Sequence, residues 1–197
     1  MSQRKVANPL ALAVLSCLNE KPMHPYEIAT TLRERHVDEA IKLNYGSLYS
    51  VIEALTRERF IEATAKLKEG KRPERTVYRL TEPGQLELHD WLSELLSQPA
   101  KEYTQFEAGL SLMPALPPSD AVALLRRRCE MLELAQASAR AVLSQLRAKS
   151  LPRLYSIDLE HRIMLREAEL TWVRNLANEI GAGTLDGTAR WQSGFTP

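Results

Sequence analysis

The sequence predicts a mainly α-helical protein of the α+β class that consists of two unequal parts, with one small β-hairpin in the first part. Three observations predict it. Apolar residues recur every three or four positions along most of the chain, two short β-rich segments follow one another within residues 60–80, and two long apolar seams occupy the C-terminal half. A chain of 197 residues suits a small domain with an appendage.

The bulk composition is that of a protein with a packed core. Hydrophobic residues make up 44% of the chain and charged residues 26%, which argues against general disorder. The formal net charge is only +1, so a nucleic-acid partner would require a local cluster of basic residues. Cys17 and Cys129 both have apolar neighbours, and we expect reduced thiols in a cytoplasmic setting.

The apolar stretch from Pro9 to Leu18 raises the question of membrane insertion. It is about half as long as the roughly 20 residues that a spanning helix needs, so we expect no membrane partner. An alternative is a short signal peptide, because Arg4 and Lys5 precede the stretch and residues 14–17 loosely resemble a lipoprotein cleavage site. Cleavage there would remove a helix that the following residues need for their core, which favours its retention.

Capping signals place three helices in the first part of the chain. Asn8 and Pro9 predict the start of a helix through Leu18, and His24-Pro25 predicts a second helix. Asn44 predicts the start of a third helix, which continues to about Arg59. The side chains that we expect to face inward from the second and third helices are Ile28, Leu32, Leu48, Val51, Ile52 and Leu55.

The helical period then stops, and two strands are predicted over residues 60–67 and 75–80, with a Gly- and Pro-containing turn at 68–73. Three helices followed by a β-hairpin is the order of a winged helix-turn-helix domain, to which we assign residues 1–97. Thr81 and Pro83 predict the start of a fourth helix. The apolar residues that share one face of this helix are Leu88, Trp91, Leu92, Leu95 and Leu96.

The C-terminal half is predicted to be an antiparallel pair of long helices. Residues 98–118 are assigned to a linker that contains a short, partly helical segment, and Ser119 is the expected N-cap of the first long helix. A turn at 150–155 joins it to the second, and both helices carry coiled-coil-like seams. We assign residues 119–182 to dimerisation and effector binding, and residues 183–197 to a flexible tail.

The third helix is the expected recognition helix. In a helix-turn-helix protein, the second helix of the motif enters the major groove with its N-terminal residues near the bases. The predicted contacts on this helix are Asn44, Tyr45, Ser47, Tyr49 and Ser50. Two alternatives stay open, since the tyrosines could instead complete the core edge and the serines could be neutral surface. Glu53 could repel phosphates or accept a hydrogen bond from cytosine.

The hairpin carries the local positive charge that the whole chain lacks. From Arg57 to Arg79 there are eight basic and four acidic residues, a local net charge of +4. Clustered cations bind phosphates because they release counterions from the nucleic acid. The predicted phosphate contacts are Arg57, Lys68, Lys71, Arg72 and Arg75. The alternative is a solvated hairpin whose lysines discourage pairing of its edges with another sheet.

Four segments in order resemble the PadR family of regulators. They are residues 10–15 (LALAVL), residues 24–28 (HPYEI), residues 46–49 (GSLY) followed by Leu55, and residues 78–84 (YRLTEPG). The resemblance covers about residues 8–97, and the two long helices resemble the larger C-terminal domain of one branch of that family. It implies a homodimer, often a repressor, that binds double-stranded operator DNA and releases it when a small-molecule effector arrives. The resemblance does not predict the DNA sequence of the operator, because residues 50–53 and the turn at 68–73 are where the choice of operator would vary.

The two long seams independently predict self-association, since one small hairpin cannot cover both. In a hairpin that turns at 150–155, Arg166 lies opposite Ala139 and near Gln136. An effector cleft is therefore expected at Gln136 and Arg166, with Trp91 or Trp172 as an aromatic wall. The alternative is that Arg166 reaches solvent or pairs with Glu167 or Glu169.

Two other classes of function compete with a DNA-binding regulator. An enzyme is disfavoured, because the chain contains no phosphate loop, metal-ligand spacing or nucleophile elbow, and its four histidines are scattered. We accordingly expect no catalytic residue, no metal and no cofactor. A winged-helix protein-interaction module is the second rival, because the fold alone does not entail DNA binding.

Overall fold

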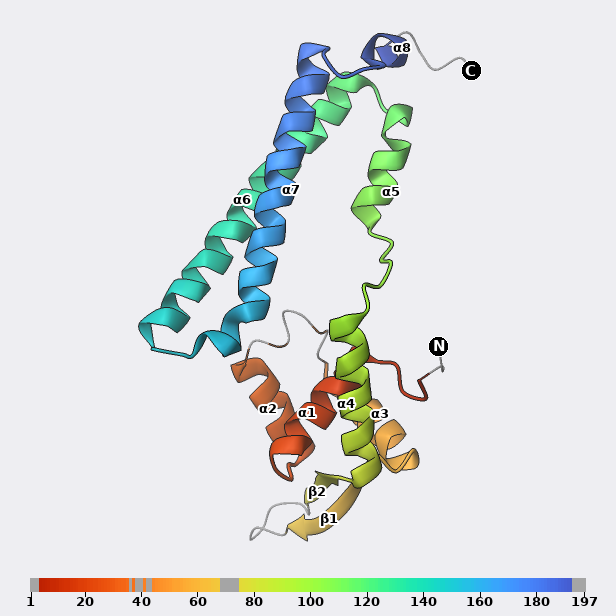
Figure 1. Cartoon of the computed structure of the whole chain (residues 1–197), viewed down its shortest axis with the longest axis vertical. Helices are drawn as coiled ribbons and strands as arrows, with labels where there is room; N and C mark the ends of the chain where they lie inside the picture. The colour runs from red at the N-terminus through yellow and green to blue at the C-terminus, as the bar shows by residue number, and fades with distance from the viewer. Residues whose placement is uncertain (1–3, 36, 38–40, 42–43, 68–74, 193–197) are drawn as a thin grey trace. The chain divides into compact units, whose positions relative to one another are not determined.

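Figure 1 shows the chain as a computed structural model in which residues 4–35, 37, 41, 44–67 and 75–192 are described. The chain divides into two compact units between Lys101 and Glu102. The first unit contains α1 (Pro9–Glu20), α2 (Pro25–Glu34), α3 (Tyr45–Arg57), β1 (Ile61–Leu67), β2 (Arg75–Leu80) and α4 (Glu82–Ser97). The second contains α5 (Gln105–Leu112), η2 (Met113–Ala115), α6 (Pro118–Ala148), η3 (Arg153–Ser156), α7 (Ile157–Ala182) and α8 (Thr188–Gln192). The predicted fold class is confirmed.

Helix α1 is the centre of the first unit. It contacts α2, α3, α4 and β2, and most of its side chains are buried, as an apolar run without a polar face requires. The inward positions predicted for α2 and α3 are confirmed, and they share one core with α1. The buried residues of α2 and α3 in this core are Ile28, Ala29, Leu32, Leu48, Val51, Ile52 and Leu55.

The predicted helix starts in this unit are confirmed by their caps. The Asn8 side chain accepts a hydrogen bond from the Leu10 amide at 2.9 Å. His24 Nδ1 accepts from the Tyr26 amide at 3.1 Å, while the Glu27 carboxylate accepts from the His24 amide at 2.7 Å. These bonds satisfy amide groups that have no partner within a helix.

The two strands form the predicted antiparallel hairpin, with one irregularity. Ile61 pairs with Leu80 and Leu67 with Arg75, and a β-bulge lies between Ala63 and Ala65. A third segment extends this small sheet, because Met23 and Tyr78 exchange two backbone hydrogen bonds of 3.0 Å. The link between α1 and α2 thereby joins the wing to the helices.

A close approach between backbones joins the hairpin to α4. The Thr81 hydroxyl donates to the Arg59 carbonyl at 2.7 Å and to the Phe60 carbonyl at 2.9 Å, and it accepts from the Gly84 amide at 3.2 Å. A Cβ on Gly84 would lie 2.0 Å from the Phe60 carbonyl oxygen. Glycine is therefore required here by space, since α4 begins directly against the end of α3.

The predicted face of α4 is only partly buried. Leu88 and Trp91 belong to the core of the first unit, whereas Leu92, Leu95 and Leu96 are exposed. Within the described part of the chain, α4 packs on α1 through a narrow stripe, and nothing covers the rest of the predicted face. The five apolar residues share one side of α4, as predicted, but only Leu88 and Trp91 on that side are buried.

In the second unit, α6 and α7 form the predicted antiparallel hairpin (Figure 1). The expected N-cap at Ser119 is wrong. Helix α6 begins at Pro118 after Pro117, and neither residue before Ser119 offers a capping side chain. Proline suits the first helical position because its φ is already helical and it lacks an amide hydrogen. Ser119 lies inside the first turn, where its hydroxyl contacts Asp120.

Short helices form within the residues assigned to a linker (98–118) and to a flexible tail (183–197). Helix α5 occupies much of the first segment, where Phe106, Leu110 and Met113 pack against α6 and α7. Helix α8 occupies part of the second, and Trp191 packs on the same cluster. Residues 193–197 lie outside the described residues. Both segments fold because the end of the α6–α7 hairpin offers them an apolar surface.

Ion pairs line the α6–α7 hairpin between its apolar clusters. The Arg128 Nε donates to Glu169 at 2.7 Å, and Arg174 pairs with Glu133 at 2.5 Å. The Arg128 guanidinium also stacks over the Phe106 ring at 3.6 Å, which attaches α5 to the hairpin. Among the described residues, no helix combines the length and the apolar character that a membrane crossing requires.

Candidate nucleic-acid interface

The orientation of α3 follows from its cap and its buried stripe. The Asn44 side chain accepts from the Ser47 amide at 2.7 Å, and the opposite face of the helix is buried against α1. Gly46, Tyr49 and Ser50 lie on the exposed face, as the helical wheel predicts. A Cβ at Gly46 would meet only the Asn44 Oδ1, at 3.7 Å, so packing does not require glycine there. The small residue leaves the backbone at the helix start open to a partner.

The predicted contacts of α3 differ in how accessible they are. Tyr49 exposes 49% of its surface, so it does not complete the core, whereas Ser47 is only half-exposed. The Ser50 hydroxyl donates to the Gly46 carbonyl at 3.1 Å, and its oxygen remains on the exposed face as an acceptor. The side chain of Tyr45 lies outside the described residues. Glu53 is exposed on the same side of the helix.

The tip of the wing lies outside the described residues, so Lys68, Lys71 and Arg72 stay predictions. The backbone of Arg75 pairs with Leu67 at the end of the hairpin, but its side chain is not described. At the base of the wing, the Arg79 Nε donates to Glu62 across the two strands at 2.6 Å. This pair neutralises one of the eight basic residues that the sequence count assigned to the hairpin.

Arg57 is the predicted phosphate contact for which the structure describes the whole side chain. Its side chain is largely exposed at the C-terminal end of α3. It lies 3.8 Å from the Glu58 carboxylate, which also pairs with Lys5 at 3.1 Å. The long, exposed contact leaves the guanidinium accessible to an anion, because such pairs are weak in water.

Tyr26 is a further exposed aromatic residue that the sequence reasoning did not select. It exposes 58% of its surface in the first turn of α2, the helix that precedes the recognition helix. Its neighbours Ile28 and Leu32 face the core, so the helical period alone places Tyr26 on the outer side. An aromatic residue outside the apolar stripe was the signal that could have identified it.

The four predicted effector residues are distributed over both units of the chain. Trp91 is buried in the core of the first unit, where the Arg4 guanidinium covers its ring at 5.1 Å. Arg4 is held there by Glu87 at 2.6 Å and Glu94 at 2.5 Å. The other three residues belong to the second unit. Trp172 is half-exposed and lies six residues beyond Arg166, on a different face of α7.

Gln136 is the buried polar residue that the sequence predicted on the hairpin seam. It is 6% exposed, and its Nε2 donates to the Ile163 carbonyl at 3.2 Å. Its Oε1 is buried and has no hydrogen-bond partner among the described residues. Glu167 pairs with Arg140 and Glu169 with Arg128, so neither carboxylate forms an ion pair with Arg166 within the described chain. The ion-pair alternative for Arg166 stays a prediction.

Two sequence comparisons match this chain to known transcriptional regulators. A model of the transcriptional regulator PadR-like family matches residues 14–90, which extend from α1 into α4. The negative transcriptional regulator PadR of Bacillus subtilis is 24% identical over 160 residues, which cover 81% of this chain and 87% of that protein.

Solved structures share the fold over most of the chain. The crystal structure of Bacillus subtilis PadR in complex with operator DNA has a TM-score of 0.72 at 22% identity and covers 89% of this chain and 99% of that chain. The structure of the same protein in complex with p-coumaric acid has a TM-score of 0.72 at 21% identity, and covers 87% of this chain and 98% of that chain.

Proposed function

We propose that this chain is a transcriptional regulator of the PadR-like family, and that it is a homodimeric, sequence-specific repressor that releases operator DNA in response to a small-molecule effector. The observation that carries the proposal is the capped, outward-facing start of α3, with Gly46, Tyr49 and Ser50 on its exposed face. A recognition helix needs such a face, because its first turns approach the base edges.

The proposed contacts divide into two kinds. Tyr49 and Ser50 read base edges, while Asn44, Tyr45 and Ser47 form the helix start that enters the groove. The wing cations Lys68, Lys71, Arg72 and Arg75 contact phosphates, together with Arg57. Tyr26 adds a hydroxyl from α2, which in this motif crosses the DNA backbone. Only the base-edge contacts of Tyr49 and Ser50 discriminate between DNA sequences.

Self-association is supported by apolar side chains that the chain leaves uncovered. The α6–α7 hairpin exposes apolar residues at helical spacing on both helices, and these are Leu124, Met131, Leu134, Ile157, Met164, Leu165 and Trp172. Such stripes are typical of an interface with a second copy. A two-fold symmetric dimer would place two recognition helices about 34 Å apart, or a multiple of that distance, on an inverted repeat.

Repression and an effector response are supported by the relative. Bacillus subtilis PadR is described as a negative regulator, and its structures include complexes with operator DNA and with p-coumaric acid. Within this chain, the proposed polar effector contacts are Gln136, whose buried Oε1 lacks a donor, and Arg166 on α7. Trp91, the other predicted aromatic wall, belongs to the core of the first unit.

Selection of genomic fragments by the purified protein tests the DNA-binding part. We expect enrichment of one inverted repeat, and loss of its selectivity in Tyr49→Ala. A Tyr155→Ala variant, which removes an exposed tyrosine next to the hairpin turn, serves as the matched control. A protein that is not retained on heparin at low salt and enriches no sequence would instead be a winged-helix protein-interaction module.

Effector response is tested separately with Arg166→Met. This variant should bind the selected operator with unchanged affinity and should no longer release it when a proven effector is added. Normal release by Arg166→Met would eliminate Arg166 from the effector site.

A further inference from the structure

The arm that precedes α1, residues 4–8, connects distant parts of the first unit. Arg4 contacts α4, Lys5 contacts the residue that caps the end of α3, and Val6 packs against the core around α1. Three consecutive residues of the arm thus reach three different parts of the unit. The sequence reasoning considered Arg4 and Lys5 only as flanks of a signal peptide.

Arg4 anchors this arm on α4. Its two terminal guanidinium nitrogens donate to separate carboxylates, of Glu87 at 2.6 Å and of Glu94 at 2.5 Å. The guanidinium also lies over the Trp91 ring, 5.1 Å from the ring centroid. Only 16% of the Arg4 side chain is exposed, so water screens these contacts less than it screens a pair on the open surface.

The next residue, Lys5, brings a second cation to the end of α3. Its Nζ lies 3.1 Å from the Glu58 Oε2, whereas the Arg57 Nε lies 3.8 Å from the Oε1 of the same carboxylate. The longer distance exceeds that of a hydrogen bond, so the carboxylate is held by Lys5 and not by Arg57. Glu58 caps α3 through its backbone amide, so its side chain is not needed to end the helix.

The position of the Glu58 carboxylate matters for DNA because it competes with phosphate. A carboxylate that pairs with Arg57 would occupy the same donors as a phosphate and would repel it. Lys5 neutralises this carboxylate and binds one of its oxygens. The anchor at Arg4 restricts where Lys5 can reach, because neighbouring Cα atoms are only about 3.8 Å apart.

We propose that Lys5 is a positioning residue for DNA binding, which holds the Glu58 carboxylate off Arg57 while Arg4 anchors the arm on α4. The inference rests on the proposed function, in which Arg57 contacts a phosphate. Lys5 acts on DNA through Glu58, whereas the wing cations act on the phosphates themselves. The arm therefore sets how much of the charge at the end of α3 is available to DNA.

A double-mutant cycle separates this role from a direct contact of Lys5 with DNA. The probe is a labelled DNA duplex of arbitrary sequence, because a phosphate contact carries no sequence information. Lys5→Ala should lower the affinity about twofold to fivefold at low salt, which is the range of exposed ion pairs. In a Glu58→Gln background, where no carboxylate needs to be restrained, the same change should alter the affinity by less than about 1.5-fold.

The outcomes of this cycle are distinct. An equal loss in both backgrounds would overturn the proposal, because Lys5 would then touch DNA or act by its charge alone. Lys5→Ala without effect in the parent would also overturn it and would leave the proposed function intact. A parent protein that does not bind the duplex would refute the proposed function, and this inference with it.

Arg4→Ala tests the anchor. Release of the arm should reproduce the loss caused by Lys5→Ala, again only where residue 58 is a glutamate. Arg127→Ala, which removes an exposed arginine of α6, is the matched control and should not depend on residue 58. Thermal unfolding checks that the variants remain folded at the temperature of the binding assay.

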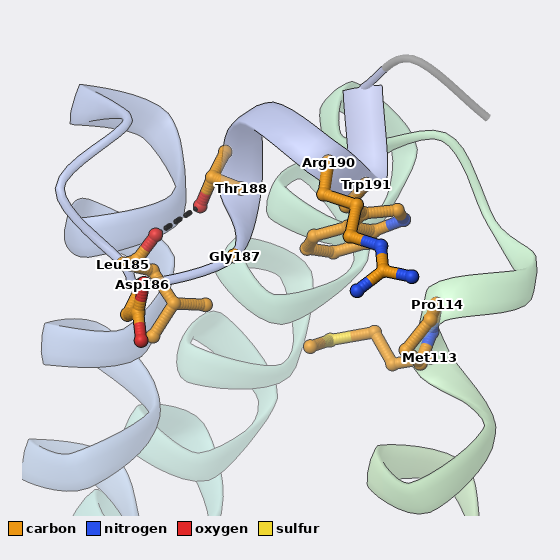
Figure 2. A pocket seen from close by; sticks show the side chains of 8 residues that line it. All are labelled: Met113, Pro114, Leu185, Asp186, Gly187, Thr188, Arg190 and Trp191. Atoms are coloured by element: carbon orange, nitrogen blue, oxygen red, sulfur yellow. Dashed lines mark hydrogen bonds between the residues drawn. The ribbon is translucent and has the colours of Figure 1, made fainter. Parts of the chain in front are cut away.

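The indole N–H signals of ¹⁵N-labelled protein report on the anchor without DNA. The Trp91 signal should shift in Arg4→Ala, because the cation leaves its ring. The Trp191 signal should stay in place, because Trp191 lines an open pocket of about 250 Å³ in the second unit (Figure 2). An unmoved Trp91 signal would contradict the anchor. A shifted Trp91 signal with normal DNA binding by Arg4→Ala would overturn its role in positioning Lys5.

Discussion

The two units of this protein are both mainly helical but bury their apolar residues differently. The first unit has one continuous core around α1, to which α2, α3, β1 and α4 contribute buried residues. Strand β2 contributes Tyr78 and Leu80, which are partly buried and pack against this core. The second divides its buried residues between two smaller clusters along the α6–α7 hairpin and leaves a row of large apolar side chains exposed. The first unit thus gathers its buried residues in one core, whereas the second distributes them along a hairpin.

The largest effect should come from Gly84, because its neighbours are backbone atoms that cannot move aside. Gly84→Ala places a Cβ 2.0 Å from the Phe60 carbonyl oxygen, and we expect destabilisation of about 3 kcal/mol or more. Gly109→Ala in α5 is the control, since nothing lies within 4 Å of its added Cβ and alanine favours helix by up to about 1 kcal/mol. Thermal unfolding followed by circular dichroism checks both variants. A Gly84→Ala protein as stable as the parent would contradict the close approach.

The next effect tests whether the exposed stripe of the second unit is an interface. Leu134→Asp places a charge on a side chain that is 68% exposed in the single chain. In a dimer that buries this position, the variant should raise the dimer Kd by at least about tenfold, or about 1.4 kcal/mol, because the charge would be desolvated. Sedimentation at several concentrations measures the change. Leu86→Asp, on the exposed side of α4, should leave association unchanged, and equal weakening by both variants would refute the assignment.

A smaller effect should distinguish the role of the hairpin in DNA binding from the role of α3. Lys71→Ala combined with Arg72→Ala should weaken binding to every DNA sequence and lower the slope of affinity against salt by about one to two contacts. Tyr49→Ala should keep the slope and reduce the preference for the operator. Arg126→Ala with Arg127→Ala removes the same charge from α6 and serves as the control. Fluorescence anisotropy at several salt concentrations measures these quantities, and similar profiles for all three variants would rule out the division of roles.

The smallest effect concerns the two cysteines, one in each unit. Burial raises the pKa of the Cys17 thiol to about 11, so its thiolate fraction at pH 8 is on the order of 0.1%. Cys129 is buried in the smaller cluster of α6 and α7. With a thiol reagent at pH 8 and increasing denaturant below the main transition, Cys129 should react first, because the smaller core opens more readily. Earlier reaction of Cys17 would reverse the proposed order of stability.

Local sequence signals predicted most of the elements because their causes act over a few residues. Asn8, Asn44 and Thr81 cap helices through hydrogen bonds that span two or three positions. The outward face of α3 follows from the spacing of its apolar residues, so Tyr49 and Ser50 could be placed before the structure was known. The same spacing in α4 placed five apolar residues on one side, of which only Leu88 and Trp91 are buried. Periodicity shows which residues share a side and does not show what covers them.

The remaining features depend on contacts between distant parts of the chain. The neutralisation of Arg79 by Glu62 requires the strand register, and the folding of residues 105–112 and 188–192 requires the apolar surface at the end of the α6–α7 hairpin. The pocket beside Trp191 exists because its indole reaches the Leu116 carbonyl across 75 positions. Composition and period therefore identified the helices, the hairpin and the outward face of α3. Tertiary packing decided which charges remain exposed and which apolar segments fold, because burial and pairing are set by neighbours that are remote in sequence.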